Sequence, residues 1–494
     1  MPMAALALTP LLLAIALLVA RQSAWIAATA GLVAAALVAL SAFPTAVPVL
    51  RESALGYFPL IVEVALILLF GMILARLLES SGAMREISRW VEDLAPSRPL
   101  GVALVVFGIV PFAESVTGFG IGVTIGVPIL VHLGATLRHS ALLGLLGLIA
   151  VPWGALGPGT TVAAALAGLD VDALGLATAR INLIPVVVVT VSVLLLTRPG
   201  LGGTIGTVAA AGLLWVGILG ANALVGMAPA GIIGSVLVIA AMGSLFAVRA
   251  RRRSRGSGAG GDSAGAGPGR SADSGAGPDA GPGAGPGAGP GLRRALLPYG
   301  VLTLGLLIAR AVAAALPAVW TEVLASPPFW LAVACAAAGA FGARATVRAA
   351  ARSWVPIGAA TAAFMLMGWI MTTTGMSTAI GSLLPAGLIL LTPWLTVAGS
   401  ILTGSNTGAN SMFAGTLDAA ATAAGVSSAG VVAAGNAAGS LAALAAPPRV
   451  AMAVQLAAPG ATVSARDVSA VQARALVVSA VAALAIGLWI QLTL

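Results

Sequence analysis

The sequence ESVTG at Glu114–Gly118 and the sequence GSNTG at Gly404–Gly408 are two short polar runs in an otherwise strongly apolar chain. Each run contains the pattern Ser-x-Thr-Gly and has apolar residues on both sides, which is typical of an interrupted membrane helix. Polar groups are costly in hydrocarbon unless they are buried in protein or line a water-filled cavity. One such run in each half of the chain therefore predicts a single transport site built from two related halves.

The composition is that of a membrane protein. Of the 494 residues, 59% are hydrophobic and only 8% are charged, and the mean hydropathy is +1.07. The formal net charge is +9, and every basic residue is arginine. The arginines cluster in predicted interhelical loops, so we interpret them as marks of the cytoplasmic side rather than as a nucleic-acid-binding surface. We expect a multi-pass protein of the cell membrane with cytoplasmic basic loops and both termini outside.

The residue counts argue against several kinds of site. One cysteine, two histidines and the absence of an HExxH pattern make a zinc or other metal site improbable. The chain contains no lysine, so it lacks the phosphate-binding lysine of a self-contained P-loop ATPase. No cofactor signature is found, and we expect an ion gradient to drive any transport.

About 20 apolar residues are needed for one membrane crossing. By this measure we predict twelve spans, at residues 4–20, 24–42, 57–78, 141–169, 181–197, 206–220, 232–248, 295–316, 329–342, 355–371, 431–458 and 475–492. The spans 141–169 and 431–458 contain several glycines and prolines, which predicts broken helices. The stretches 99–137 and 385–425 hold the polar runs and further helix breakers, and we predict a re-entrant hairpin from each, the first with its tip near Thr117.

The order span, hairpin, broken span, span occurs in both halves of the chain, and the arginine distribution gives the two copies opposite orientations. The predicted fold is an all-α polytopic membrane protein with about 12 transmembrane helices and two re-entrant hairpins in two inverted-topology repeats with broken helices. We predict a first membrane half at 1–248 and a second at 295–494. Residues 249–294, rich in Gly, Ala and Pro after an arginine cluster, predict a disordered cytoplasmic linker.

Three stretches carry a resemblance to a known family. PFAESVTGFG at Pro111–Gly120 resembles the F-x-E-G-x-x-G-F-G signature of the L-lactate permease family, and LTGSNTGANSMF at Leu402–Phe413 resembles its L-T-G-S-x-T-x-x-N-x-x-F run. AAGNAAGS at Ala433–Ser440 is similar to the next polar stretch of the family. The resemblance implies cation-coupled uptake, with the proton as the expected cation, of lactate and related 2-hydroxy acids such as glycolate. Ser115 stands where the family has glycine, and the run Ala446–Arg449 also differs, so a small carboxylate is the more general expectation.

The chemistry of a carboxylate site can also be argued from the residues. Helix amino termini offer unpaired N–H groups with partial positive charge, and glycines allow the backbone to approach a ligand closely. Hydroxyl and amide side chains can add hydrogen bonds, although each of them could instead satisfy only the broken-helix backbone. The predicted substrate-binding residues are Ser115, Thr117, Gly118, Gly120, Ser405, Asn406, Thr407, Gly408, Asn410, Asn436 and Arg449.

Charged residues inside the apolar segments are the candidates for coupling and charge recognition. Glu114 is the leading candidate for a proton carrier, because an intramembrane carboxylate beside a substrate motif can exchange a proton during transport; its alternative role is a structural bond to the hairpin backbone. Glu63 and Asp418 are weaker candidates that could simply face water. Arg449 could pair bidentately with a carboxylate substrate, or with Asp418, or lie at a cytoplasmic boundary.

The expected partners are a small carboxylate, a coupling cation and the lipid bilayer, with a homodimer expected only by analogy. Three rival classes are a membrane-embedded enzyme, a passive channel and a sodium-coupled dicarboxylate symporter of similar architecture. We find no paired-carboxylate or histidine-rich cluster that favours an enzyme, and two hairpins in one chain suit alternating access better than a channel. The Ser-Asn-Thr tripeptide keeps the sodium-coupled symporter as the alternative.

Overall fold

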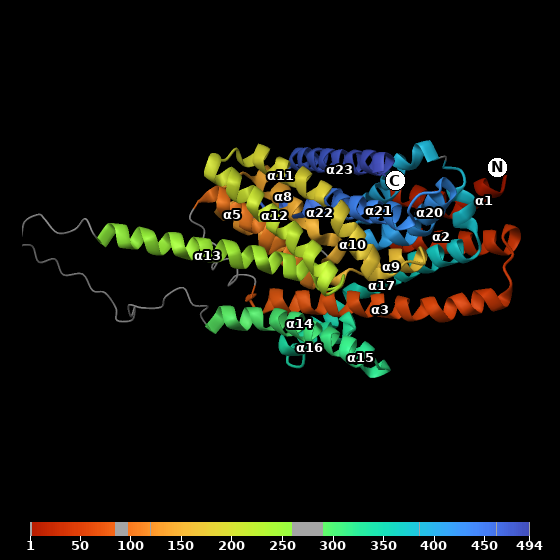
Figure 1. Cartoon of the computed structure of the whole chain (residues 1–494), viewed down its shortest axis with the longest axis horizontal. Helices are drawn as coiled ribbons and strands as arrows, with labels where there is room; N and C mark the ends of the chain where they lie inside the picture. Colours follow the sequence, from red (N-terminus) through yellow and green to blue (C-terminus); the bar gives the residue numbers. More distant parts are fainter. Residues whose placement is uncertain are drawn as a thin grey trace, which may run out of the picture.

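The computed structural model describes residues 2–83, 97–118, 120–258, 290–384, 386–460 and 462–493, and all regular structure in these ranges is helical (Figure 1). This confirms the predicted all-α class. In the first half the helices are α1 (Pro2–Val19), α2 (Ala24–Ala42), α3 (Val47–Ser80), α5 (Arg98–Leu104), the π-helical η1 (Val105–Ile109), α6 (Val110–Thr117), α7 (Ile121–His132), α8 (Leu137–Leu146), the 3₁₀-helical η2 (Gly147–Leu156), α9 (Pro158–Leu166), α10 (Val171–Ile181), α11 (Leu183–Thr197), α12 (Leu201–Leu224) and α13 (Ala230–Gly258).

The second half follows the same helical plan. Its helices are α14 (Pro290–Ala315), α15 (Val319–Leu324), α16 (Pro327–Ala337), α17 (Arg344–Thr373), α18 (Met376–Gly381), the 3₁₀-helical η3 (Ala386–Leu391), α19 (Thr392–Thr403), α20 (Asn406–Ala424), α21 (Ser428–Ala442), the 3₁₀-helical η4 (Ala443–Ala445), α22 (Pro447–Leu456) and α23 (Ala465–Thr493). In both halves a helix–turn–helix (α6–α7 and α19–α20) is followed by an interrupted helix and then by a further apolar helix.

Eleven helices or continuous helical runs of the described residues are long and apolar enough to cross a membrane. They differ in how far the protein itself covers them. In the run Arg98–Thr117, 94% of the residues in the most apolar stretch are buried, against 28% for Ala24–Ala42. The helical arm that leads into the first polar turn is thus enclosed by the rest of the protein.

The structure differs from the predicted segments at several places, and the apolar helix at Met3–Val19 is also shorter than a candidate span. The stretch 329–342, predicted as a crossing, forms only the eleven-residue helix α16, which is shorter than the ~20 residues of a full span. Helix α13 continues to Gly258 and α14 starts at Pro290, so helix extends into both ends of the predicted linker. Residues 259–289 of that linker lie outside the described part. The count of twelve crossings and the re-entrant path of the hairpins stay predictions.

Both interrupted helices break beside proline. In the first half, α8 continues as η2, and Ala155 and Leu156 adopt positive φ angles of 39° and 68° before α9 starts at Pro158. In the second half, Ala446 is extended ahead of Pro447, because proline disfavours the helical conformation in the residue before it. The first break leaves the amino terminus of α9 buried, whereas Pro447 and Pro448 at the start of α22 are exposed.

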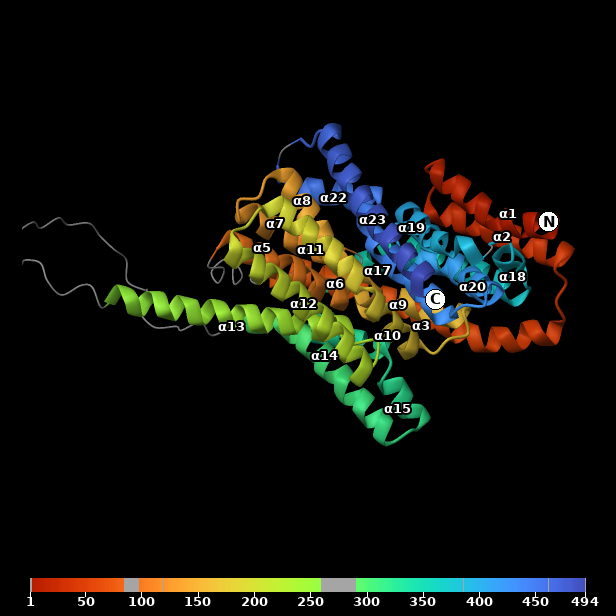
Figure 2. The same cartoon turned by 45° about the horizontal axis from the view of Figure 1, so that its top comes forward.

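The two halves interlock at these interrupted segments. Helix α6 packs on η2 of its own half and α19 packs on α21, while α20 packs on α9 and α22 packs on α7 and α8 across the halves. Figures 1 and 2 show α14, α15 and α16 on one side of the bundle, and α13 projecting beyond the other helices. The polar turns therefore lie where helices from both halves meet.

Candidate functional site

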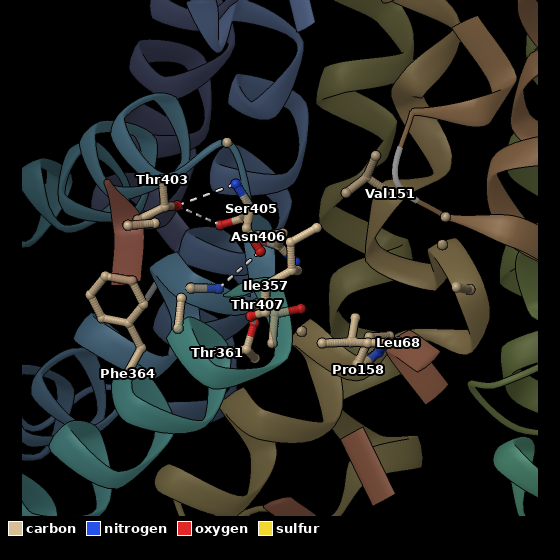
Figure 3. A pocket seen from close by; sticks show the side chains of 18 of the residues that line it. Leu68, Val151, Pro158, Ile357, Thr361, Phe364, Thr403, Ser405, Asn406 and Thr407 are labelled. Atoms are coloured by element: carbon tan, nitrogen blue, oxygen red, sulfur yellow. Dashed lines mark hydrogen bonds between the residues drawn. The ribbon is translucent and has the colours of Figure 1, made fainter. Parts of the chain in front are cut away.

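A cavity of about 470 Å³ lies between the two halves, within the size range of small-molecule sites (Figure 3). Figure 3 shows Ser405, Asn406 and Thr407 on one side, with Leu68 and Pro158 facing them. The cavity reaches the surface at Trp25, which is 46% exposed. The lining residues are Ser23, Ala24, Trp25, Leu68, Glu114, Gly118, Val151, Gly154, Ala155, Pro158, Gly159, Pro356, Ile357, Ala360, Thr361, Phe364, Thr403, Gly404, Ser405, Asn406, Thr407, Gly408 and Arg449.

The first polar turn is closed by a carboxylate. Helix α6 ends at Thr117, Gly118 has φ 68° and ψ −162°, and Gly120 has φ 80° as the residue before α7. The backbone N–H of Gly120 donates to Glu114 Oε2 at 3.0 Å and to Oε1 at 3.2 Å. The amino terminus of α7, with its partial positive charge, is thus occupied by the protein's own anion, since Glu114 is only 2% exposed.

The second polar turn is closed by neutral groups. Gly404 has φ 68° and ends α19, and Ser405 Oγ accepts the N–H of Gly408 at 3.2 Å as the cap of α20. Thr403 Oγ1 donates to Ser405 O at 3.0 Å and accepts the N–H of Ser405 at 3.2 Å. No carboxylate takes part in these bonds, so the positive potential at the start of α20 is not cancelled locally.

Arg449 is positioned by the break between η4 and α22. Pro447 starts α22, and Arg449 in its first turn lines the cavity and attracts the carboxylate of Glu114 electrostatically. No ion pair within 4.0 Å joins these two described side chains. The Nη1 atom of Arg449 is buried and has no hydrogen-bond partner among the described residues. A buried donor atom without a partner is costly unless a ligand or water supplies an acceptor.

Behind the cavity, buried amides join both halves. Asn436 Oδ1 accepts from Asn406 Nδ2 at 2.9 Å and from Asn410 Nδ2 at 2.8 Å. Asn436 Nδ2 donates to Thr160 Oγ1 at 2.9 Å and to Thr178 Oγ1 at 3.1 Å. These bonds connect α20 and α21 to α9 and α10 and fix the tip of the second turn against the first half.

The structure separates the predicted site residues into two groups. Glu114, Gly118, Ser405, Asn406, Thr407, Gly408 and Arg449 line the cavity. Ser115, Thr117, Gly120, Asn410, Asn436, Glu63 and Asp418 do not line it. The predicted pairing of Arg449 with Asp418 is not formed, because Asp418 accepts a hydrogen bond from Ser428 and Arg449 makes no ion pair among the described residues.

Most residues of the second group have structural partners instead. Thr117 donates to Ala113 O at 2.5 Å within its own helix, and Asn410 donates to Gly159 O at 3.0 Å. Gly120 donates its N–H to Glu114, so it contacts a residue that lines the cavity without lining it itself. Ser115 faces α13, where a β-carbon on Gly231 would collide with its hydroxyl.

Sequence reasoning missed the apolar wall of the cavity. Helix α17 supplies Ile357, Ala360, Thr361 and Phe364, and α3 supplies Leu68. These residues belong to spans without a polar break, so nothing in their local pattern separates cavity-lining positions from lipid-facing ones. Gly154, Pro158 and Gly159, by contrast, belong to the span that was predicted to be broken.

Among the described residues, no three His, Cys, Asp or Glu side chains gather as a metal site. In the comparisons with known proteins, residues 3–321 match the family model described as L-lactate permease, which is more than half of the chain and includes the first polar turn. No curated protein and no solved structure matches the chain. With its helices of membrane-spanning length and this match, the chain belongs to the L-lactate permease family, a family of transporters.

Proposed function

We propose that this protein carries L-lactate, or a related small 2-hydroxy carboxylate such as glycolate, across the cell membrane in symport with a proton. Transport would proceed by alternating access at the cavity between the two halves. The linker and basic loops would lie in the cytoplasm and both termini outside. Membership of the L-lactate permease family supports the substrate class.

The unused donor of Arg449 is the observation that carries the proposal. Arg449 lines a cavity together with the amino terminus of α20, and its Nη1 atom is buried with no acceptor among the described residues. A carboxylate would supply that acceptor and could use both donors of the guanidinium fork. Asn406 and Thr407 in the first turn of α20 are then within the same cavity for the 2-hydroxyl group.

The charges around the cavity support coupling to one proton. Glu114 and Arg449 balance each other before substrate enters, and a bound monocarboxylate would leave one net negative charge in a poorly solvated space. Such a charge is expensive at low dielectric. A proton on Glu114 would restore neutrality, so anion binding and proton uptake favour each other. Coupling of one proton to one monocarboxylate follows from this charge balance.

The opposite wall suits the alkyl part of the substrate. Its apolar surface is formed by Leu68, Val151, Ile357, Ala360 and Phe364. A molecule with a carboxylate at one end and a short alkyl group at the other fits this division. A dicarboxylate would place its second charge against the apolar wall without a described partner.

Uptake of labelled L-lactate into proteoliposomes tests the proposal. With an inward proton gradient and no sodium, the wild-type protein should accumulate lactate above the outside concentration. Glu114→Gln should lose gradient-driven accumulation but still exchange internal for external lactate, because it mimics the protonated state. Glu63→Gln is the matched control, since Glu63 is a half-buried carboxylate of α3 outside the cavity, and it should accumulate lactate normally.

Two results would refute this assignment: wild-type protein that binds lactate but never accumulates it, or Glu114→Gln protein that accumulates as much as the wild type.

A sodium-coupled carrier is the second candidate, and a specific observation favours it. The Oδ1 atoms of Asn406 and Asn410 are buried without donors among the described residues, and oxygen atoms beside unwound helices can coordinate sodium. Accumulation of succinate driven by sodium alone would select this candidate.

A further inference from the structure

A second cavity of about 230 Å³ lies apart from the one described above, where helices of the first half end near predicted cytoplasmic loops. The start of α5, the loop between α7 and α8, the first turn of α8 and the end of α11 surround it. Its lining residues are Arg98, Pro99, Val102, Ala135, His139, Leu143, Leu196 and Thr197. None of them belongs to the candidate substrate site.

The polar side of this second cavity is positively charged. Arg98 lines it, with one guanidinium nitrogen above Gly134, and the half-buried His139 lies in the electrostatic field of Arg98 and of Arg474 from α23. No described carboxylate lines it. Asp467 is already engaged, since its Oδ1 accepts from Arg138 Nε at 2.7 Å and its Oδ2 accepts from Ser464 at 2.6 Å.

A helix end adds to this positive potential. Helix α8 begins at Leu137, and the residue before it, Thr136, makes no capping bond with its side chain. Among the described residues, the N–H groups of Leu137, Arg138 and His139 therefore have no side-chain cap, whereas that of Ser140 donates to Thr136 O at 2.8 Å, so three N–H groups are available to an anion. Ala135, just before α8, and His139, within its first turn, both line the second cavity. The opposite wall is apolar, with Val102, Leu143 and Leu196.

We propose that this second cavity binds a phosphate group, held between Arg98, His139 and the first turn of α8. The combination of basic groups with an apolar wall at a helix-bundle edge fits the phosphodiester headgroup of an anionic lipid, whose chains would lie on Leu196. Free inorganic phosphate offers a phosphate anion without the chains. Occupancy would join α5, which leads into the Glu114 turn, to the interrupted helix α8–η2.

The test measures the thermal unfolding midpoint of the purified full-length protein in detergent. Phosphatidylglycerol and inorganic phosphate are titrated separately, with phosphatidylcholine and with chloride of equal ionic strength as blanks. A ligand that binds only the folded state raises the midpoint as its concentration rises. Arg98→Gln and His139→Gln are compared with Arg348→Gln, which removes an exposed arginine of α17 outside the cavity.

We expect phosphatidylglycerol to raise the midpoint of the wild type and of Arg348→Gln equally, and Arg98→Gln to raise the apparent dissociation constant at least roughly tenfold. Arg98→Lys should recover part of the lost affinity for phosphatidylglycerol. If Arg98→Gln is unstable, Arg98→Lys and His139→Gln provide the same test. If inorganic phosphate raises the midpoint and phosphatidylglycerol does not, the second cavity is still an anion site, but its ligand is a soluble anion and not a lipid. Equal losses in Arg98→Gln and Arg348→Gln, or no stabilisation by either anion, would overturn the proposal.

Discussion

The two polar turns are both helix–glycine turn–helix segments, but they differ in charge. Each has a glycine of φ 68° at the end of one helix and a capped amino terminus at the start of the next. Glu114 closes the first turn with a carboxylate, whereas Ser405 closes the second with a hydroxyl. The first turn therefore carries its own anion, and the second leaves the positive end of α20 open to the cavity.

This difference assigns different tasks to the two halves in the proposed mechanism. The first half contributes the only carboxylate that lines the cavity among the described residues, and the second contributes the only such guanidinium, Arg449. Coupling chemistry would then be located at the first turn and substrate recognition at the second. Substitutions that exchange or remove these charges test that division.

The largest effect is expected from giving the second turn the charge of the first. Ser405→Asp keeps a side chain able to cap α20 but places a second anion in the lining of the cavity, next to the expected carboxylate. It should raise the KM for lactate roughly 100-fold or more, because like charges held together at a buried site cost several kcal/mol. Initial rates of uptake over a range of lactate concentrations measure the effect.

Ser405→Asn is the matched control, since it caps the helix equally well without a charge. Its KM should stay within about threefold of the wild type, in line with a capping change of a few tenths of a kcal/mol. If Ser405→Asp and Ser405→Asn behave alike, the open positive potential at α20 plays no part in binding, and the proposed difference between the two turns disappears.

Part of the polar lining of this cavity could be found from the sequence, for a physical reason. Polar residues in an apolar chain are rare, so Glu114, Asn406, Thr407 and Arg449 stand out against their surroundings, and all four line the cavity. The all-α class follows equally directly from the composition. These signals depend on residue type alone.

The remainder depends on three-dimensional packing that no local pattern encodes. Asn410 and Asn436 have the same residue type as Asn406, yet they face each other behind the cavity rather than into it. In the sequence, Phe364 and Leu68 cannot be distinguished from lipid-facing apolar residues of the same spans. Side-chain direction on a helix and the meeting of distant helices decide these cases, so the apolar wall could not be foreseen.

A smaller effect should come from removing the positive charge. Arg449→Gln takes away the proposed carboxylate partner and leaves Glu114 unbalanced, so the KM for lactate should rise roughly 30-fold or more. Combining it with Glu114→Gln removes both buried charges, and the double variant should unfold at a higher temperature than Arg449→Gln alone. Thermal unfolding of the four proteins in one detergent measures the coupling. An unchanged KM, or effects on unfolding that simply add, would contradict the charge balance.

A further comparison, on stability and not on KM, separates the two turns by their backbone alone. Gly118 combines φ 68° with ψ −162°, a region open almost only to glycine, and an added β-carbon would lie 2.8 Å from that of Ala155. Gly404 has φ 68° and ψ 16°, and the nearest atom to its added β-carbon would be 3.7 Å away. Gly118→Ala should therefore lower the free energy of unfolding by about 3 kcal/mol and Gly404→Ala by about 1 kcal/mol.

Reversible unfolding in mixed micelles gives both values. Since Ala155 lines the cavity, Gly118→Ala should also slow transport, whereas Gly404→Ala should leave the transport rate close to that of the wild type. Equal destabilisation by the two substitutions would show that the first turn is not the tighter one. The close packing of Gly118 on η2 would then not be what holds Glu114 against α7.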